Sequence, residues 1–219
     1  MTYHLVPPQE ISVRIAGLQK ALSEAFFTGA FVFDKINLFY FTGTIQKAVL
    51  FVPAQGEPVF FIRRSLERAE KETPLKHLVP LTRFNGLFDY LSKKKYDLAR
   101  LGVDESTTPV FLFKKFRTTF PNTVFEDTGF MMAVIRAVKS DYEIAQIREA
   151  GRRHETLYKA IPGMIRKGMT EWELGSRIHA CMLELGFTGV CRLADPNTEL
   201  FAGAVSFGES GNCPTASVG

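Results

Sequence analysis

Apolar and polar positions at the start of the chain follow first a helical and then a strand pattern. Apolar residues at spacings of three and four predict a helix that buries one face and ends before Gly29. The apolar positions of this helix are Ile11, Ile15, Leu18 and Leu22. Runs of β-branched and aromatic residues then predict strands at 30–33, 38–41, 48–52 and 59–62. The middle runs are apolar on both faces, as expected for a sheet covered by helices, and a turn favours a hairpin between the last two.

Shorter elements continue this alternation to about residue 135. We expect strands at 78–81, 101–103 and 124–125, and helices at 65–73, 87–91, 110–116 and 131–135. Thr108 followed by Pro109 is typical of a helix N-cap with proline at the first helical position. Strands that alternate with helices predict an α/β domain.

The pattern changes at residues 136–144, where a long helix begins. Ser140 and Glu143 have the spacing of a capping box, in which the hydroxyl accepts from the Glu143 N–H and the carboxylate accepts from the Ser140 N–H. One apolar stripe follows, which predicts a core-facing helix that Pro162 and Gly163 stop. Its positions are Ile144, Ile147, Gly151, His154, Tyr158 and Ile161.

A second capped helix follows the first. Thr170 and Glu173 repeat the capping box, and Gly186 is placed to close the helix after its apolar stripe. Strands are expected at 187–191 and 202–207 around a turn at 195–197, followed by a loop at 208–212 that needs unusual backbone angles. We therefore expect a boundary near residues 130–140 and two domains, 1–135 and 136–219.

Composition is that of an ordinary soluble globular protein, because 46% of the 219 residues are hydrophobic and 23% are charged. The net charge of +4 comes from scattered pairs and triplets at 63–64, 93–95 and 114–115, which favours solvated helix faces over a nucleic-acid partner. No apolar run approaches the roughly 20 residues that span a bilayer, and the first residues lack a signal-peptide pattern. We expect a cytoplasmic protein with no membrane partner.

Reactive residues are few and far apart. The three cysteines, Cys181, Cys191 and Cys213, are odd in number, so we expect reduced, largely buried thiols. No pair of His, Asp and Glu residues has metal-ligand spacing, and no serine or cysteine has the surroundings of a nucleophile. The histidines are His4, His77, His154 and His179. We therefore expect no catalytic residue, metal ligand or cofactor site in this chain.

Four segments in order resemble the creatinase, aminopeptidase P and prolidase family of metallopeptidases. Asn-Leu-Phe-Tyr-Phe-Thr-Gly at 37–43 is similar to part of that family's N-terminal domain, and Gly-Met-Thr-Glu-Trp-Glu-Leu at 168–174 is similar to a helix start in its catalytic domain. Residues 136–144 resemble the family's linker and first catalytic-domain helix. Residues 205–214 resemble the strand and loop that approach its active site.

The resemblance implies a fold and a function. It implies a creatinase-type α/β N-terminal domain, with a mixed sheet flanked by helices, followed by an incomplete α+β pita-bread domain. The family holds two divalent metal ions (manganese, cobalt or zinc) with two Asp, one His and two Glu, and these ligands would lie beyond the loop at 208–212. The implied parent is an Xaa-Pro aminopeptidase or dipeptidase that takes peptides with proline at the second position. The N-terminal domain would shape substrate access and form a homodimer.

One residue departs from the family pattern. When Gly208 and Pro214 are aligned with the family's strand-end glycine and its Pro-His pair, Thr215 stands where many peptidases have a substrate-side histidine. Thr215 is therefore the candidate substrate-binding residue of this chain.

Two further hypotheses remain open beside the peptidase. The first is a non-hydrolytic protein-binding module on the pita-bread fold. The second is a metal-independent hydrolase similar to creatine amidinohydrolase. The sequence of the following hundred or so residues in the reading frame would decide among the three.

Overall fold

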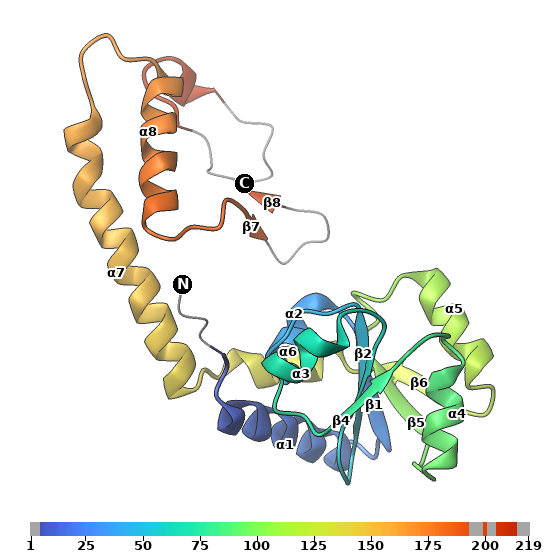
Figure 1. Cartoon of the computed structure of the whole chain (residues 1–219). Helices are drawn as coiled ribbons and strands as arrows, with labels where there is room; N and C mark the ends of the chain where they lie inside the picture. Colours follow the sequence, from blue (N-terminus) through green and yellow to red (C-terminus); the bar gives the residue numbers. More distant parts are fainter. Residues whose placement is uncertain (1–4, 193–198, 201–204, 214–219) are drawn as a thin grey trace. The chain divides into compact units, whose positions relative to one another are not determined.

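The computed structural model of the protein describes residues 5–192, 199–200 and 205–213. The chain divides into two compact units, Met1–Lys139 and Ser140–Gly219, which we call unit 1 and unit 2. Figure 1 colours the chain from its first residue to its last. Among the described residues, none of the helices combines the length and the apolar content that a bilayer crossing requires.

Six strands form one mixed sheet in unit 1 (Figure 1). Their order is β4-β3-β2-β1-β5-β6, with β2 antiparallel to both β1 and β3 and with all other neighbours parallel. The strands are β1 (Gly29–Val32), β2 (Ala48–Pro53), β3 (Val59–Ile62), β4 (His77–Pro80), β5 (Arg100–Val103) and β6 (Val124–Asp127). The expected α/β fold with a mixed sheet, and the hairpin of β2 and β3, are confirmed.

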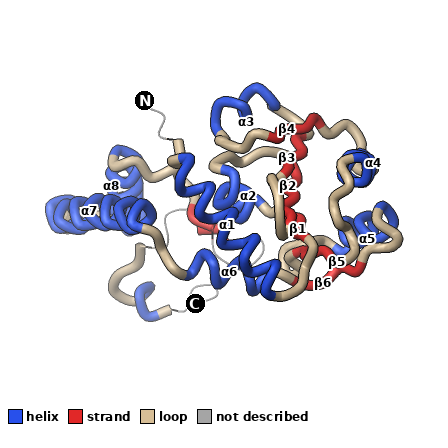
Figure 2. The backbone as a smooth tube through the Cα atoms, turned by 90° about the horizontal axis from the view of Figure 1, so that it is seen from below, coloured by secondary structure: helices blue, strands red, loops and turns tan. Residues whose placement is uncertain are grey.

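Helices cover both faces of this sheet. Figure 2 shows α1, α2 and α6 on one side of the strands and α4 and α5 on the other. Every residue of β1, β2 and β3 is buried, which explains why these strands are apolar at consecutive positions. The helices of unit 1 are α1 (Pro8–Glu24), α2 (Lys35–Thr42), α3 (Leu66–Glu72), α4 (Gly86–Lys93), α5 (Val110–Thr119) and α6 (Gly129–Ala137).

Aromatic rings fill the layer between the sheet and α4 and α5. The ring of Phe31 in β1 lies 4.9 Å from that of Phe116 in α5, 5.2 Å from that of Phe51 in β2 and 5.3 Å from that of Phe120, measured between centroids. All four side chains are fully or almost fully buried. Such pairs contribute about 0.5–1.5 kcal/mol each beyond the area that they bury. The aromatic layer therefore fixes how α5 packs on the strands.

The strand expected at 38–41 is wrong, because these residues form α2. Asp34 is the N-cap, and its Oδ1 accepts from the N–H groups of Ile36 at 3.0 Å and Asn37 at 2.9 Å. Gly43 ends the helix in the left-handed conformation, with a φ of 76°. The run is rich in aromatic residues because α2 is buried on most sides, and this tertiary packing outweighs the intrinsic strand preference of those residues.

The predicted N-cap at Thr108 is also wrong. Pro109 occupies the N-cap of α5, and no side chain caps the helix there. The Thr108 hydroxyl instead donates to the carbonyl of Asp104. The sequence pattern predicted that the Thr108 hydroxyl caps α5, but this hydroxyl instead stabilises the loop that precedes the helix.

Both predicted capping boxes of unit 2 are confirmed. At the start of α7 (Asp141–Met164), the Glu143 N–H donates to Ser140 Oγ at 3.2 Å and the Ser140 N–H donates to Glu143 Oε2 at 3.0 Å. At the start of α8 (Glu171–Glu184), the equivalent bonds join Thr170 and Glu173 at 3.3 and 2.8 Å. These two local signals fix where both helices begin.

Two expectations for α7 are wrong. The helix does not stop at Pro162 and Gly163 but continues to Met164, because a proline in the last turn removes only one helical hydrogen bond. The stripe does not face a core among the described residues: Ile147 is 54% and Tyr158 68% exposed, and Leu157 is the buried residue of the helix. In the described part of unit 2, α7 packs against α8 and leaves much of its stripe uncovered.

The end of α8 is confirmed, whereas the strands after it are placed differently. Gly186 has a φ of 95°, and the N–H of Phe187 donates to the carbonyl of Met182 at 2.9 Å, as in a Schellman motif. Instead of a strand at 187–191, the described strands are β7 (Cys191–Arg192) and its antiparallel partner β8 (Glu199–Leu200). Of the strand expected at 202–207, residues 205–207 are not a strand, whereas residues 202–204 and the turn expected at 195–197 lie outside the described residues.

Candidate functional site

The segment 37–43 meets the last turn of α6 within unit 1. Arg136 Nη1 donates to Asn37 Oδ1 over 3.2 Å, although the two residues are 99 positions apart. The hydroxyl of Tyr40 donates to the carbonyl of Ile135 over 3.4 Å. Asn37 is buried, and a buried amide without a hydrogen-bond partner would destabilise the fold. The bond from Arg136 supplies such a partner. Segment 37–43 and the start of segment 136–144 are thereby held together.

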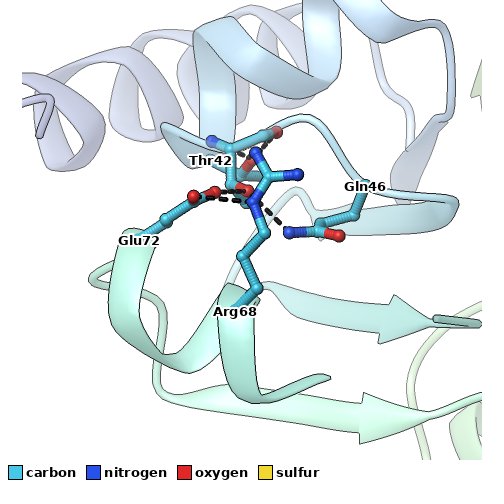
Figure 3. A network of polar contacts seen from close by, with 5 residues as sticks. Thr42, Gln46, Arg68 and Glu72 are labelled. Carbon is cyan, nitrogen blue, oxygen red and sulfur yellow. Dashed lines mark hydrogen bonds and ion pairs between the residues drawn. The ribbon is translucent and has the colours of Figure 1, made fainter. Parts of the chain in front are cut away.

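A buried carboxylate organises the loop that follows α2, as Figure 3 shows. Glu72 is the last residue of α3, and its side chain is 8% exposed. Arg68 Nε donates to Glu72 Oε1 over 2.7 Å, and Thr44 Oγ1 donates to Glu72 Oε2. Gln46 Nε2 donates in turn to Thr44 Oγ1 over 3.0 Å. We call Thr42, Thr44, Gln46, Arg68 and Glu72 the Glu72 cluster.

The backbone of this loop is fixed from within as well. The hydroxyl of Thr42 donates to the carbonyl of Leu38 over 2.7 Å and accepts from the N–H of Thr44 over 3.2 Å. Between these two threonines, Gly43 adopts its left-handed conformation, which a residue with a Cβ rarely takes. The loop 42–46 therefore has one well-defined shape, set by side chains from α2 and α3.

A cavity of about 160 Å³ opens beside the Glu72 cluster. Its apolar wall includes Leu5, Phe39 and Ile45, each between 44% and 46% exposed, and its polar wall is formed by Arg68 and Glu72. The carboxylate and the guanidinium are paired with each other, and no cysteine or histidine lines the cavity. The arrangement can receive an apolar group and hold a loop in place.

A larger groove of about 340 Å³ lies between α7 and α8 in unit 2. Arg153 crosses it: its Nε donates to Glu149 Oε1 over 2.9 Å, and its Nη1 donates to the carbonyl of Leu185 over 3.0 Å. The second of these bonds satisfies a carbonyl at the end of α8. The groove is lined by Gln146, Glu149, Ala150, Arg153, His154, Leu157, Met182, Leu185, Gly186 and Phe187.

A carboxylate at the start of α8 contacts the loop that precedes Thr215. Glu171 Oε1 accepts from the N–H of Phe207 over 2.7 Å and from the hydroxyl of Ser210. The Ser210 hydroxyl and the Phe207 N–H, in that order, hold the pKa of the Glu171 carboxyl below its ordinary value of 4.5. Because the folded-state pKa is lowered, the stabilisation from these bonds is present above the unfolded-state pKa and is lost as pH falls through the folded value.

The residues singled out from the sequence are not brought together in the described structure. Thr215, the candidate substrate-binding residue, lies outside the described residues, as does His4. His77 lies in the edge strand β4 of unit 1, whereas His154 and His179 lie on α7 and α8 of unit 2. His179 Nδ1 is buried without a hydrogen-bond partner, and its ring packs edge-on against that of Phe187 at 6.3 Å.

The described residues do not fit the metal pair that the family resemblance implies. Within residues 5–192, 199–200 and 205–213, no three His, Cys, Asp or Glu side chains lie close enough to hold a metal ion. The carboxylates with well-defined partners are already used in bonds to protein groups, as Glu72 and Glu171 illustrate. We therefore derive no step through a metal for this part of the chain.

The expectation that the three cysteines are largely buried is wrong. Cys181 is half-buried on α8, and Cys191 and Cys213 are exposed. The two exposed thiols lie in the short β7 and in the loop after Ser210, where little packs over the chain among the described residues. Their burial was inferred from the usual preference of cysteine, which loops at the surface do not follow.

Sequence reasoning missed both Glu72 and Glu171 as structural centres. Glu72 lies in a charged helix beside Glu67 and Glu70, and its only local signal is a spacing of three from the buried Ala69. Glu171 is at the first position of α8, where an acidic residue is common for reasons of helix electrostatics alone. Neither position reveals a distant partner.

Comparison with known proteins agrees, in family and in fold, with the resemblance found in the sequence. Residues 14–138 match the family described as Creatinase/Prolidase N-terminal domain. An uncharacterised peptidase of Staphylococcus epidermidis is 22% identical over 171 residues, covering 75% of this chain and 48% of that protein. The chain thus spans about half the length of the curated relatives that it matches.

Solved structures show the same fold. An Xaa-Pro dipeptidase from Bacillus anthracis has a TM-score of 0.73 at 20% identity, over 81% of this chain and 50% of that one. An X-Pro aminopeptidase from Thermotoga maritima MSB8 has a TM-score of 0.68 at 19% identity, over 81% and 51% of the two chains. A prolidase from Pyrococcus furiosus has a TM-score of 0.64 at 20% identity, over 78% and 50%. The chain has the fold of about one half of such proteins.

Proposed function

The chain belongs to the Creatinase/Prolidase N-terminal domain family, and on that premise we propose that it is the N-terminal portion of a metal-dependent Xaa-Pro aminopeptidase or dipeptidase. The observation that carries this proposal is the extent of the likeness. The fold likeness to an Xaa-Pro dipeptidase covers 81% of the chain, whereas unit 1 holds 139 of the 219 residues, or 63%. The likeness therefore includes part of unit 2, beyond the N-terminal family domain.

In this proposal residues 1–135 are the creatinase-type N-terminal domain and residues 136–219 are the first half of a pita-bread catalytic domain. The substrate is a peptide with proline at the second position, and Thr215 lies on the substrate side. The two divalent metal ions, manganese, cobalt or zinc, are held by residues in the half of such hydrolases that this chain does not span. The support for this last point is that the described residues offer no donor set of their own.

Unit 1 shapes access to the substrate and joins two copies of the protein. The support is the surface beside the Glu72 cluster, where a loop of fixed shape presents Leu5, Phe39 and Ile45 to solvent around a cavity. Apolar side chains that gather at one place on a soluble protein commonly mark a contact with another surface. A preorganised loop also loses little conformational entropy when it docks.

We expect the 219-residue chain to form a homodimer through unit 1. Light scattering after size exclusion should give twice the 24.6 kDa of one chain over a wide range of concentrations. Phe39→Ser should shift the mass toward the monomer, whereas Phe111→Ser, which changes a 73% exposed phenylalanine of α5 on the far side of the sheet, should not. A monomer mass for the unchanged chain at every concentration would rule out the dimer.

The experiment that tests the proposed function compares three substrates on the longer protein: Ala-Pro, Ala-Ala and creatine. The Ala-Pro bond differs from the Ala-Ala bond because proline has no N–H, so a site built for it distinguishes the two. We expect Ala-Pro to be hydrolysed much faster than Ala-Ala and creatine to be untouched. Hydrolysis of creatine without added metal would favour the amidinohydrolase hypothesis. No turnover of any substrate would favour a non-hydrolytic binding module.

A further inference from the structure

Residues 205–210 lie against the first half of α8, where two different kinds of contact hold them. Val205 packs over Gly175, with its Cγ2 3.7 Å from where a Cβ on that glycine would lie. One turn earlier on the helix, Glu171 accepts hydrogen bonds from Phe207 and Ser210. The segment is thus joined to α8 by an apolar contact and by a charged one, although the residues in contact are at least thirty positions apart in the sequence.

The carboxylate of Glu171 is not needed to cap the helix. The capping box of α8 is formed by Thr170 and Glu173, and both of its reciprocal bonds are present without Glu171. An acidic residue at the first helical position is favoured by the helix dipole whether or not it has a partner. The two bonds from Glu171 to the loop therefore serve the loop rather than the helix.

These bonds also stabilise the shape of the loop. Gly208 has a φ of 64°, Ser210 Oγ lies 2.9 Å from the carbonyl oxygen of Phe207, and residues Ser210–Asn212 form a 3-10 turn. Glu171 binds both ends of the tight turn 207–210. Hydrogen bonds to an ionised acceptor are about twice as strong as neutral ones, which suits a contact that must hold an exposed turn.

We propose that Glu171 is a positioning residue that holds the turn 207–210 against α8 and thereby fixes the loop that the family resemblance places on the approach to the active site. This inference rests on the proposed function, because the place of the turn 207–210 affects catalysis only if the longer protein is a peptidase whose active site this loop approaches. The pKa of Glu171, lowered by the same two donors, agrees with a carboxylate that stays ionised while it holds the turn.

The first test measures the contact itself in the 219-residue chain by NMR. In the unchanged chain, the Phe207 amide proton should titrate with Glu171, with a midpoint below 4.5. Glu171→Ala should abolish this titration and speed exchange of the Phe207 amide about tenfold. Glu171→Gln should restore most of the protection, because the amide keeps an acceptor oxygen, but not the titration. Glu184→Gln is the matched control, because it removes an exposed carboxylate from the other end of α8 and should change neither signal.

The second test measures hydrolysis of Ala-Pro by the longer protein. Glu171→Ala should lower kcat about tenfold with little change in melting temperature, Glu171→Gln should recover most of the loss, and Glu184→Gln should match the unchanged protein. An unaltered Phe207 amide in Glu171→Ala overturns the positioning role whatever the activity. If the unchanged longer protein does not hydrolyse Ala-Pro, the proposed function fails and the effect on kcat fails with it, whereas the Phe207 signals still decide whether Glu171 holds the turn.

Discussion

Thr215→His in the longer protein is expected to raise the rate of Ala-Pro hydrolysis by about a hundredfold. The family resemblance aligns Thr215 with a substrate-side histidine, which could donate a neutral or charged hydrogen bond to a developing oxyanion. Threonine offers only a short neutral hydroxyl. One oxyanion donor is worth on the order of 3 kcal/mol in the transition state, which corresponds to a hundredfold or more in rate. The measurement is kcat/KM for the variant and the unchanged protein under the same metal conditions.

Thr215→Val is the matched control for that variant. It removes the hydroxyl but keeps the branched shape of the side chain, and we expect it to leave the rate nearly unchanged. If Thr215→Val abolishes activity and Thr215→His does not restore it, the threonine has a role of its own. The alignment of Gly208 and Pro214 with the family pattern would then be wrong.

Glu72→Ala is expected to destabilise the 219-residue chain by about 2–3 kcal/mol, because hydrogen bonds to a charged group are worth about 1.5–3 kcal/mol and the partner Thr44 is left buried without its acceptor. A change of this size shifts the ratio of folded to unfolded protein between about 30-fold and 160-fold. The loss in the free energy of unfolding is measured by chemical denaturation of the 219-residue chain, with the unfolding transition followed by circular dichroism. A loss below about 0.5 kcal/mol would show that the Glu72 cluster does not hold the loop 42–46.

Arg68→Met provides the contrast within the same cluster. The Arg68 side chain is 53% exposed, so the pair has the character of a partly solvated salt bridge, and water from the adjoining cavity can replace the guanidinium. We expect a loss of about 1 kcal/mol, smaller than that of Glu72→Ala. Equal losses for the two variants would indicate that the ion pair, rather than the bond to Thr44, supports the loop.

Several signals that act over a few residues were read correctly from the sequence, although the N-cap expected at Thr108 was not. The stripe of α1, the capping boxes at Ser140 and Thr170, and the glycine that ends α8 all depend on neighbours within one or two turns. The error at 38–41 has the opposite origin. Those residues prefer strands by themselves, and the packing of α2 against α1, together with the caps at Asp34 and Gly43, makes them helical.

The polar centres could not be predicted from the sequence, because each depends on partners that the fold brings together. Thr44 and Glu72 are 28 positions apart, and Ser210 and Glu171 are 39 apart. A carboxylate on a charged helix gives no sign of which loop it will meet. The exposure of the α7 stripe was equally hidden, since periodicity identifies an apolar face but not whether a neighbour covers it.

The most direct test of the account is the metal dependence of Ala-Pro hydrolysis, measured side by side for the longer protein and the 219-residue chain. We expect the longer protein to lose activity when a chelator removes its metal and to regain it with manganese, cobalt or zinc. The 219-residue chain should retain no stoichiometric metal after dialysis and release no proline. Turnover by the 219-residue chain with bound metal, or full activity of the longer protein after complete removal of metal, would contradict the account.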